Sequence, residues 1–134
     1  MIRSIFSVIA AALVGYFVIA LLEAIIHQVT GISASDQKNF KLQLAEIPKL
    51  ALLFIWSAYI LGSITAGAVA AVLCRKYQIK AAAFSGLLLL LAGFINLYMI
   101  PHPTWFIIGT TITYVPFAVI GGNYGKNIKD KNVI

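Results

Sequence analysis

The sequence predicts an all-α integral membrane protein, a bundle of four helices that each cross the bilayer. Of its 134 residues, 61% are hydrophobic and 10% are charged, and the mean hydropathy is +0.95. Soluble domains carry about 25% charged residues, so this composition is typical of a chain that lies mostly in lipid. Four long apolar stretches supply the predicted spans, at about 5–28, 50–73, 81–100 and 105–121.

Each span is expected to be helical, because backbone groups in hydrocarbon can pair only within their own segment. The first stretch is long enough to cross roughly 30 Å at about 1.5 Å per residue. It is too long for the apolar region of a signal peptide, so we expect it to remain as a span. The chain is predicted to be a single membrane domain, 1–134, ending in a short, polar, frayed tail over 122–134.

The connection between the first two spans is the only sizeable loop, and its pattern predicts a short amphipathic helix over about 36–47. Asp36 can cap the start of this helix, and Pro48 ends it. Its apolar residues recur at helical spacing: Phe40, Leu44 and Ile47. We expect this helix to lie on the outer membrane surface.

The distribution of lysine and arginine predicts the orientation, because positive residues concentrate on the cytoplasmic side. Seven of the ten fall at the end of the bundle that holds both termini: Arg3, Arg75, Lys76, Lys80, Lys126, Lys129 and Lys131. The other three, Lys38, Lys41 and Lys49, fall at the opposite end. Both termini are therefore predicted to be cytoplasmic. Nucleic-acid binding is disfavoured, because the basic clusters adjoin apolar spans, where they attract anionic lipid.

Small residues predict where the helices approach closely, since such residues let backbones pack together in lipid. The second span carries two adjacent strips at four-residue spacing: Gly62, Ala66, Ala70 and Ser63, Gly67, Ala71. Gly93 and Gly109 are candidates in the third and fourth spans. We also expect Pro116 to kink the fourth span, with Thr113 or a neighbouring helix serving the carbonyl that this proline frees.

Polar side chains within the spans are the candidate functional residues. Glu23 is the only acidic residue in a span, and His27 follows four residues later on the same helical face. Asn96 lies near the same end of the third span. Together with other polar residues they form a layer about 6 to 13 Å below the outer surface. The other members are Ser57, Tyr59, Thr110 and Thr111.

The corner between the last two spans contains His102 between Pro101 and Pro103. Each proline disfavours helix in the residue before it, so the third span is expected to end here. Thr104 can cap the fourth span, and Trp105 can anchor it at the interface. Only His102 lacks a structural reason, and a functional role beside Glu23 and His27 is an open alternative.

Several uses of this polar layer are compatible with the residues. Glu23 could belong to a hydrogen-bonded structural network with Asn96 and a hydroxyl group. Glu23, His27 and His102 could instead bind a divalent metal such as zinc, because two imidazoles and a carboxylate leave zinc an open position for activated water. A wet cavity at Glu23 could serve proton-coupled or small-solute transport. Lipid or quinone binding beside Trp56, Tyr59 and Trp105 is the fourth alternative.

The order of these residues resembles a family of small four-span bacterial inner-membrane proteins of uncharacterised activity. The resemblance rests on Glu23 with His27 and, most specifically, on "NLYMIPHPTWF" at 96–106. Relatives often continue the first span with a Tyr-Pro segment, whereas "QVTG" stands here at 28–31. The resemblance implies the fold and the membrane compartment and adds no activity.

The function favoured by the sequence is therefore that of a non-enzymatic accessory subunit of a larger membrane complex, or of a homo-oligomer that packs through the strips of the second span. No phosphate-binding glycine loop, CxxC pair or nucleophile elbow occurs in the sequence, and a single cysteine excludes an internal disulfide. A metal-dependent enzyme at the outer face and a small-solute transporter remain as alternatives, and the lipid bilayer is the expected partner.

Overall fold

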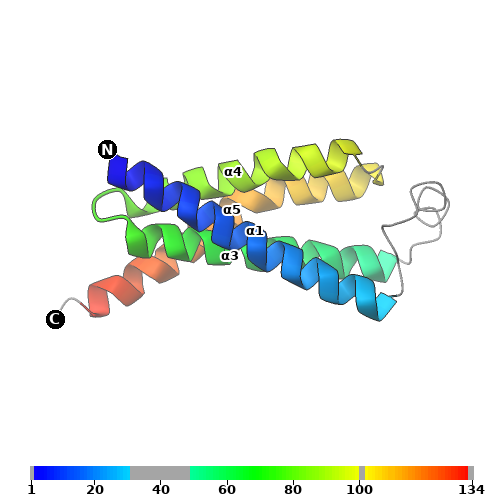
Figure 1. The fold of residues 1–134 in the computed structure, drawn as a ribbon, viewed down its shortest axis with the longest axis horizontal. Helices are drawn as coiled ribbons and strands as arrows, with labels where there is room; N and C mark the ends of the chain where they lie inside the picture. Colours follow the sequence, from blue (N-terminus) through cyan, green and yellow to red (C-terminus); the bar gives the residue numbers. More distant parts are fainter. Residues whose placement is uncertain (1, 31–48, 100–101, 133–134) are drawn as a thin grey trace.

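The computed structural model describes residues 2–30, 49–99 and 102–132, and within them the chain forms four α-helices (Figure 1). These are α1 (Ile2–Thr30), α3 (Lys49–Leu73), α4 (Gln78–Met99) and α5 (Thr104–Lys131). Each is long and apolar enough to cross a membrane. The predicted all-α fold with four spanning helices is confirmed. The predicted amphipathic helix at 36–47 lies outside the described residues.

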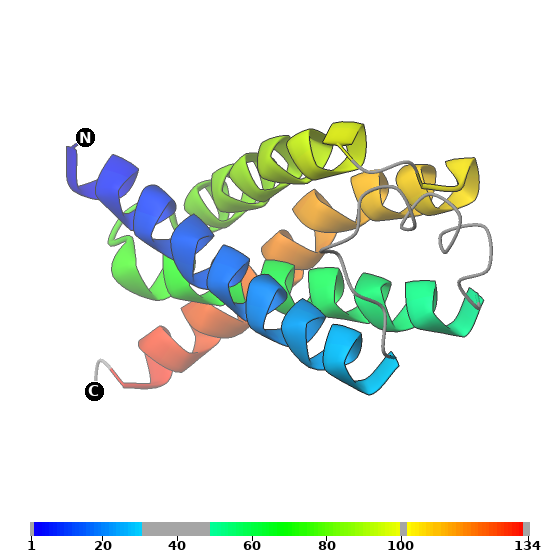
Figure 2. The same cartoon turned by 45° about the vertical axis from the view of Figure 1, so that its right-hand side comes forward.

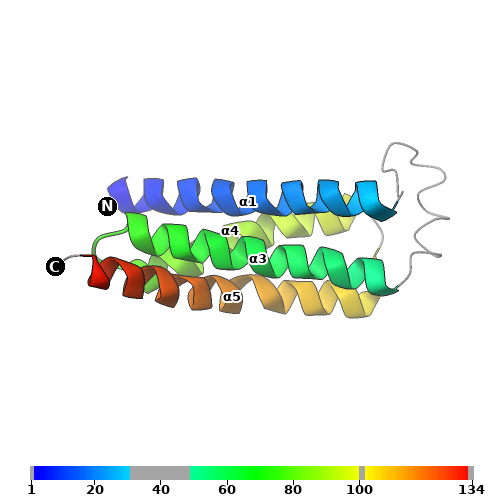
Figure 3. The same cartoon turned by 90° about the horizontal axis from the view of Figure 1, so that it is seen from below.

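The helices alternate in direction, so the start of α1, the α3–α4 connection and the end of α5 share one end of the bundle (Figure 1). We call this the N-terminal end. Figure 3 shows α3 between α1 and α5, and α3 also contacts α4. Within the described part of the chain, α1 and α5 do not contact each other. Away from the N-terminal end, α1 and α4 diverge (Figures 1 and 2).

Large apolar side chains cover the outside of the bundle, where lipid solvates them. Every helix contributes to this surface, for example Phe17 (68% exposed), Phe54 (52%), Leu91 (54%) and Ile112 (66%). A water-soluble bundle would bury such residues. The outer surface is therefore that of a multi-pass membrane protein in contact with the bilayer.

The close helix contacts are made by glycine and alanine. At the α1–α3 crossing, a Cβ on Gly15 would lie 2.6 Å from the Ala66 Cβ, and one on Gly62 would collide with Ile19. At the α3–α5 crossing, a Cβ on Gly67 would collide with the backbone of Ala118. These helices approach until backbones touch, which the absence of side-chain bulk permits.

Both small-residue strips of α3 are covered inside a single copy of the chain. Gly62 and Ala66 face α1, and Gly67 faces α5. All six strip residues are buried: Gly62, Ser63, Ala66, Gly67, Ala70 and Ala71. The strips therefore do not provide the surface for packing between copies that the sequence suggested.

The fourth spanning helix is longer than predicted, because α5 continues through the expected frayed tail to Lys131. Gly122 and Gly125 bring this extension against Ala82 and Ala68, respectively. The Lys129 Nζ then donates hydrogen bonds to the carbonyls of Val72 (2.9 Å) and Cys74 (2.8 Å) at the end of α3. Contacts with α3 and α4 hold this segment in a helix. The polar sequence of the segment does not indicate these contacts.

The expected cap of α5 is wrong, and one of the two expected partners for the carbonyl freed by Pro116 is excluded. Pro103, not Thr104, occupies the capping position, and its carbonyl accepts the backbone N–H groups of Phe106 and Ile107 without a side-chain cap. The Thr113 hydroxyl donates to the Gly109 carbonyl at 2.7 Å and does not serve the carbonyl freed by Pro116. Thr113 also accepts the indole N–H of Trp56 at 2.8 Å, which links α5 to α3.

Candidate functional site

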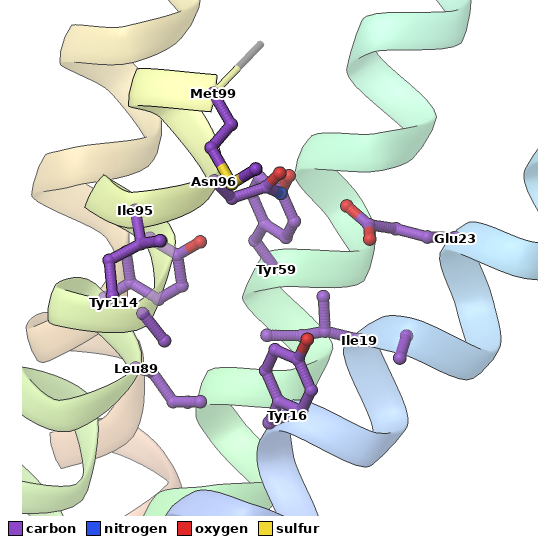
Figure 4. Close-up of a pocket in the computed structure, with 12 residues that line it drawn as sticks. Tyr16, Ile19, Glu23, Tyr59, Leu89, Ile95, Asn96, Met99 and Tyr114 are labelled. Atoms are coloured by element: carbon purple, nitrogen blue, oxygen red, sulfur yellow. The ribbon is translucent and has the colours of Figure 1, made fainter. Parts of the chain in front are cut away.

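Glu23 lies on α1, seven residues before the helix ends at Thr30, which is about 10 Å along the axis. Its side chain is half-buried and points from α1 across towards α3 and α4 (Figure 4). A carboxyl group at this depth requires a polar partner or water. The structure supplies such partners on the facing helices.

Tyr59 of α3 is the central partner of Glu23. Its hydroxyl lies close enough to the Glu23 carboxyl and to the Asn96 side chain to interact with both (Figure 4). The Asn96 amide can donate to the Tyr59 oxygen while the Tyr59 hydroxyl donates to Glu23. The structure thus brings Glu23 and Asn96, both predicted site residues, to the two sides of one phenol.

Aromatic packing holds the ring of Tyr59 in place. Tyr59 is 4% exposed and stacks on Tyr114 of α5, with ring centroids 5.7 Å apart, and it also contacts Phe106 at 6.2 Å. Tyr114 is itself close enough to Glu23 to interact with its charge. Gly93 permits this arrangement, because a Cβ there would lie 2.7 Å from the Tyr114 hydroxyl.

These residues line a pocket of about 270 Å³ where α1 and α4 diverge (Figure 4). We call it the Glu23 pocket. Its polar groups come from Glu23, Tyr59, Asn96, Tyr114 and Tyr16. The remaining walls are aliphatic or small: Ile19, Ala20, Leu89, Ala92, Gly93, Ile95 and Met99. A few polar groups converging in an apolar hollow are typical of a small-molecule site.

His27 lies one turn beyond Glu23 on α1 and interacts electrostatically with it. It does not line the Glu23 pocket. Its Nδ1 atom is buried and has no hydrogen-bond partner among the described residues. The Glu23–His27 pair on one helical face therefore exists, as the spacing predicted.

His102 does not lie where a shared site with Glu23 and His27 would require it. Its imidazole stacks on the ring of Phe106, with centroids 5.1 Å apart and planes at 12°. Trp105 meets the same phenylalanine edge-on at 5.8 Å. The proline-flanked corner thus packs its histidine onto the start of α5.

The predicted three-ligand metal site is not formed. Residues 2–30, 49–99 and 102–132 contain no group of three or more histidine, cysteine or acidic side chains placed to bind one metal ion together. Glu23, His27 and His102 therefore do not meet as a ligand set. Stacking on Phe106 accounts for the position of the third member.

The hydroxyl groups of three other residues in the predicted polar layer are used locally. Ser57 donates to the Phe54 carbonyl, Thr110 to Phe106 and Thr111 to Ile107. Such bonds to the preceding turn satisfy a hydroxyl in a helix without any partner helix. None of the three lines the Glu23 pocket.

Sequence reasoning missed Tyr114 and Tyr16 as members of the site. Tyr16 lies seven residues before Glu23, and Tyr114 lies opposite Gly93. The spacing of seven, two helical turns, was the available signal for Tyr16. For Tyr114 the signal was weaker, because a tyrosine in an apolar span reads equally well as core.

The other predicted packing residues lie at helix contacts. A Cβ on Gly109 would lie 2.8 Å from the Trp56 ring, and Ala70 is fully buried in one core cluster with Ala11.

Comparisons with known proteins add no relationship: no protein-family model, curated protein or solved structure matches this chain at a significant level. The resemblance to a family of small four-span proteins stays a prediction.

Proposed function

We propose that this protein binds a small organic cation in the Glu23 pocket, as the solute-binding step of a small membrane transporter. The observation that carries this proposal is the position of Glu23, whose carboxyl faces a pocket of about 270 Å³ inside the membrane-spanning region. Among the described residues, His27 is the basic side chain that interacts electrostatically with the Glu23 carboxyl. A positively charged solute would provide the counter-charge that a carboxylate in hydrocarbon requires.

The shape and chemistry of the pocket favour an organic cation of modest size. Its volume lies just below the range of about 300 to 1,000 Å³ that holds drug-sized ligands. Three tyrosines line it, and aromatic faces attract cations. The aliphatic walls of Ile19 and Leu89 suit the hydrocarbon part of such a solute.

Cation binding is expected to be coupled to proton release. When no cation is bound, we expect the Glu23 carboxyl to be neutral. Burying even a neutral polar group without a hydrogen bond costs about 2–7 kcal/mol, and an ionised carboxylate without a partner costs more. The cation replaces the proton as the partner of Glu23. Affinity should therefore rise with pH until Glu23 is fully ionised and then level off.

The binding step can be tested with benzyltrimethylammonium, a small aromatic cation that carries no titratable proton. Isothermal titration calorimetry on the full chain in lipid nanodiscs should show saturable binding that tightens with increasing pH. The isosteric Glu23→Gln variant should bind at least tenfold more weakly, about 1.4 kcal/mol, and without pH dependence. Asp130→Asn is the matched control, because Asp130 is exposed at the end of α5.

Two results would contradict the proposal. One is the absence of saturable binding to the wild-type protein. The other is binding that Glu23→Gln leaves unchanged, which would place the cation elsewhere. Uptake of the same cation into proteoliposomes, driven by an outward proton gradient, then tests whether bound solute crosses the membrane.

We infer further that the protein lies in a bacterial inner membrane with both termini cytoplasmic, which puts the Glu23 pocket nearer the outer face. The support for this orientation is the seven-to-three distribution of basic residues between the two ends. A homo-oligomer that packs through the small-residue strips of α3 has less support, because both strips are covered within one copy. A role as an accessory subunit of a larger complex stays a prediction.

A further inference from the structure

A second pocket lies between α1 and α4 at the N-terminal end of the bundle, separate from the Glu23 pocket. Its volume is about 560 Å³. Its walls are almost entirely apolar, with Ile5, Val8 and Ile9 on α1 and Phe84 and Leu88 on α4. We call it the α1–α4 groove.

The apolar wall of the groove faces lipid. Ile5 is 56% exposed, Ile9 48% and Phe84 59%. A hollow with such sides is reached from the bilayer, so its natural occupant is a hydrocarbon chain. One acyl chain lying between the two helices would cover all three residues.

Positive charge gathers at one end of the groove, where the α3–α4 connection passes into α4. Lys80 and Tyr77 line the groove there. The Nζ atoms of Lys76 and Lys80 lie 5.6 and 5.4 Å from the centre of the Tyr77 ring. Two ammonium groups therefore lie close to one aromatic ring at the groove mouth, and of these two lysines Lys80 lines the groove. Lys129, which lies nearby, donates instead to the carbonyls of Val72 and Cys74.

We propose that the α1–α4 groove is a binding site for an anionic phospholipid. The acyl chain lies along Ile5, Val8 and Phe84, and the phosphate group lies at the groove mouth, where Lys80 and the neighbouring Lys76 attract it. The two parts match an amphipathic ligand with an apolar tail and one negative head group. Each basic residue near the membrane surface contributes attraction to anionic lipid, so a zwitterionic lipid would bind less well.

Native mass spectrometry can test this site on the full chain released from mixed phosphatidylglycerol and phosphatidylcholine. Phosphatidylglycerol should be retained at least fivefold more than phosphatidylcholine, with one molecule per chain. The Lys76→Gln, Lys80→Gln double variant should lose this preference. Lys126→Gln, Lys131→Gln is the matched control, because both lysines are exposed at the same end of the bundle.

The apolar half of the site needs its own variant. Leu88→Trp would fill the groove and should reduce phosphatidylglycerol retention at least threefold. Leu91→Trp adds the same indole to α4 at an exposed position that does not line the groove, and it should have no effect. The helical circular dichroism spectrum of every variant checks that the fold is kept.

Four outcomes would overturn the proposal. Equal retention of the two lipids would indicate ordinary boundary lipid. Equal loss in both lysine double variants would indicate general attraction to the charged end of the bundle. Retention that Leu88→Trp leaves intact would show that the head group binds without the groove. Displacement by inorganic phosphate alone would likewise assign the site to a free anion.

Discussion

Tyr59 connects the candidate site to the core of the protein. Its ring is 4% exposed and packs on Tyr114 and Phe106, while its hydroxyl reaches Glu23 and Asn96. A side chain held by packing presents its polar atom in one position. The hydroxyl of Tyr59 is therefore preorganised for whatever partner Glu23 binds.

Replacing Tyr59 with phenylalanine should weaken cation binding while leaving the fold unchanged. The ring and its stacking remain, and one hydrogen bond of about 1 kcal/mol is lost, which corresponds to roughly fivefold in affinity. Calorimetric titration with benzyltrimethylammonium measures the change. Tyr98→Phe is the control, because Tyr98 is 94% exposed. Unchanged affinity in Tyr59→Phe would show that the Tyr59 hydroxyl does not contribute to cation binding.

Two glycine-to-alanine substitutions should have different effects, one mainly on the stability of the bundle and the other mainly on the Glu23 pocket. A methyl group on Gly67 meets the backbone of Ala118, so Gly67→Ala should destabilise the bundle by about 1–3 kcal/mol. A methyl group on Gly93 meets the end of the Tyr114 side chain, which can shift. Gly93→Ala should cost less stability and instead disturb the Glu23 pocket. Thermal unfolding and cation titration of both variants separate the effects, and equal melting temperatures would contradict this ranking.

At the scale of elements, the ends of α3 and α5 depend on each other. The last turn of α3 leaves backbone carbonyls without partners within the helix. Lys129 of α5 donates to two carbonyls at this end, those of Val72 and Cys74. In return, this contact and the packing of Gly125 on Ala68 keep the polar end of α5 helical.

Lys129→Met should loosen this end of both helices, because methionine keeps an apolar stem and loses both hydrogen bonds. Loss of hydrogen bonds from a charged donor corresponds to about 1.5–3 kcal/mol of local stability. Hydrogen exchange should accelerate in the last turns of α3 and α5. Lys126→Met, at an exposed site on α5, should leave exchange unchanged. Equal exchange in the two variants would show that Lys129 does not hold these ends together.

At the scale of the whole molecule, α1 and α4 have two hollows between them. The Glu23 pocket lies where the helices diverge, and the α1–α4 groove lies at the N-terminal end. α3 packs against every other helix and forms the centre of the bundle. Both pockets therefore lie on the α1–α4 side of the bundle, where the two proposed ligands would bind.

The proposed orientation can be measured with single added cysteines. In intact cells, a membrane-impermeant maleimide should label Thr30→Cys, and it should label Lys131→Cys only after permeabilisation. Both positions are exposed at opposite ends of the bundle, and the native Cys74 is 1% exposed, which keeps its background low. Labelling in the reverse order would show that the termini lie outside.

Much of the fold could be predicted from composition and length. The four spans are recognisable because a helix in lipid must be apolar over the thickness of the bilayer. Glu23 and Asn96 stood out as polar residues at similar depths, and the structure places both in one pocket. The end of α5 was missed, because tertiary contacts stabilise a helix there that its polar sequence does not favour.

Hydropathy and the order of residues are enough to establish the class of protein, the number of spans and the end of the bundle at which the polar residues gather. These properties depend on local hydropathy and on the rise of a helix. The packing of the helices places Tyr59 between Glu23 and Asn96 and stacks His102 on Phe106, and neither contact can be derived from the sequence. These side-chain contacts depend on how each helix is rotated about its axis. The close glycine contacts between helices distant in the sequence set that rotation.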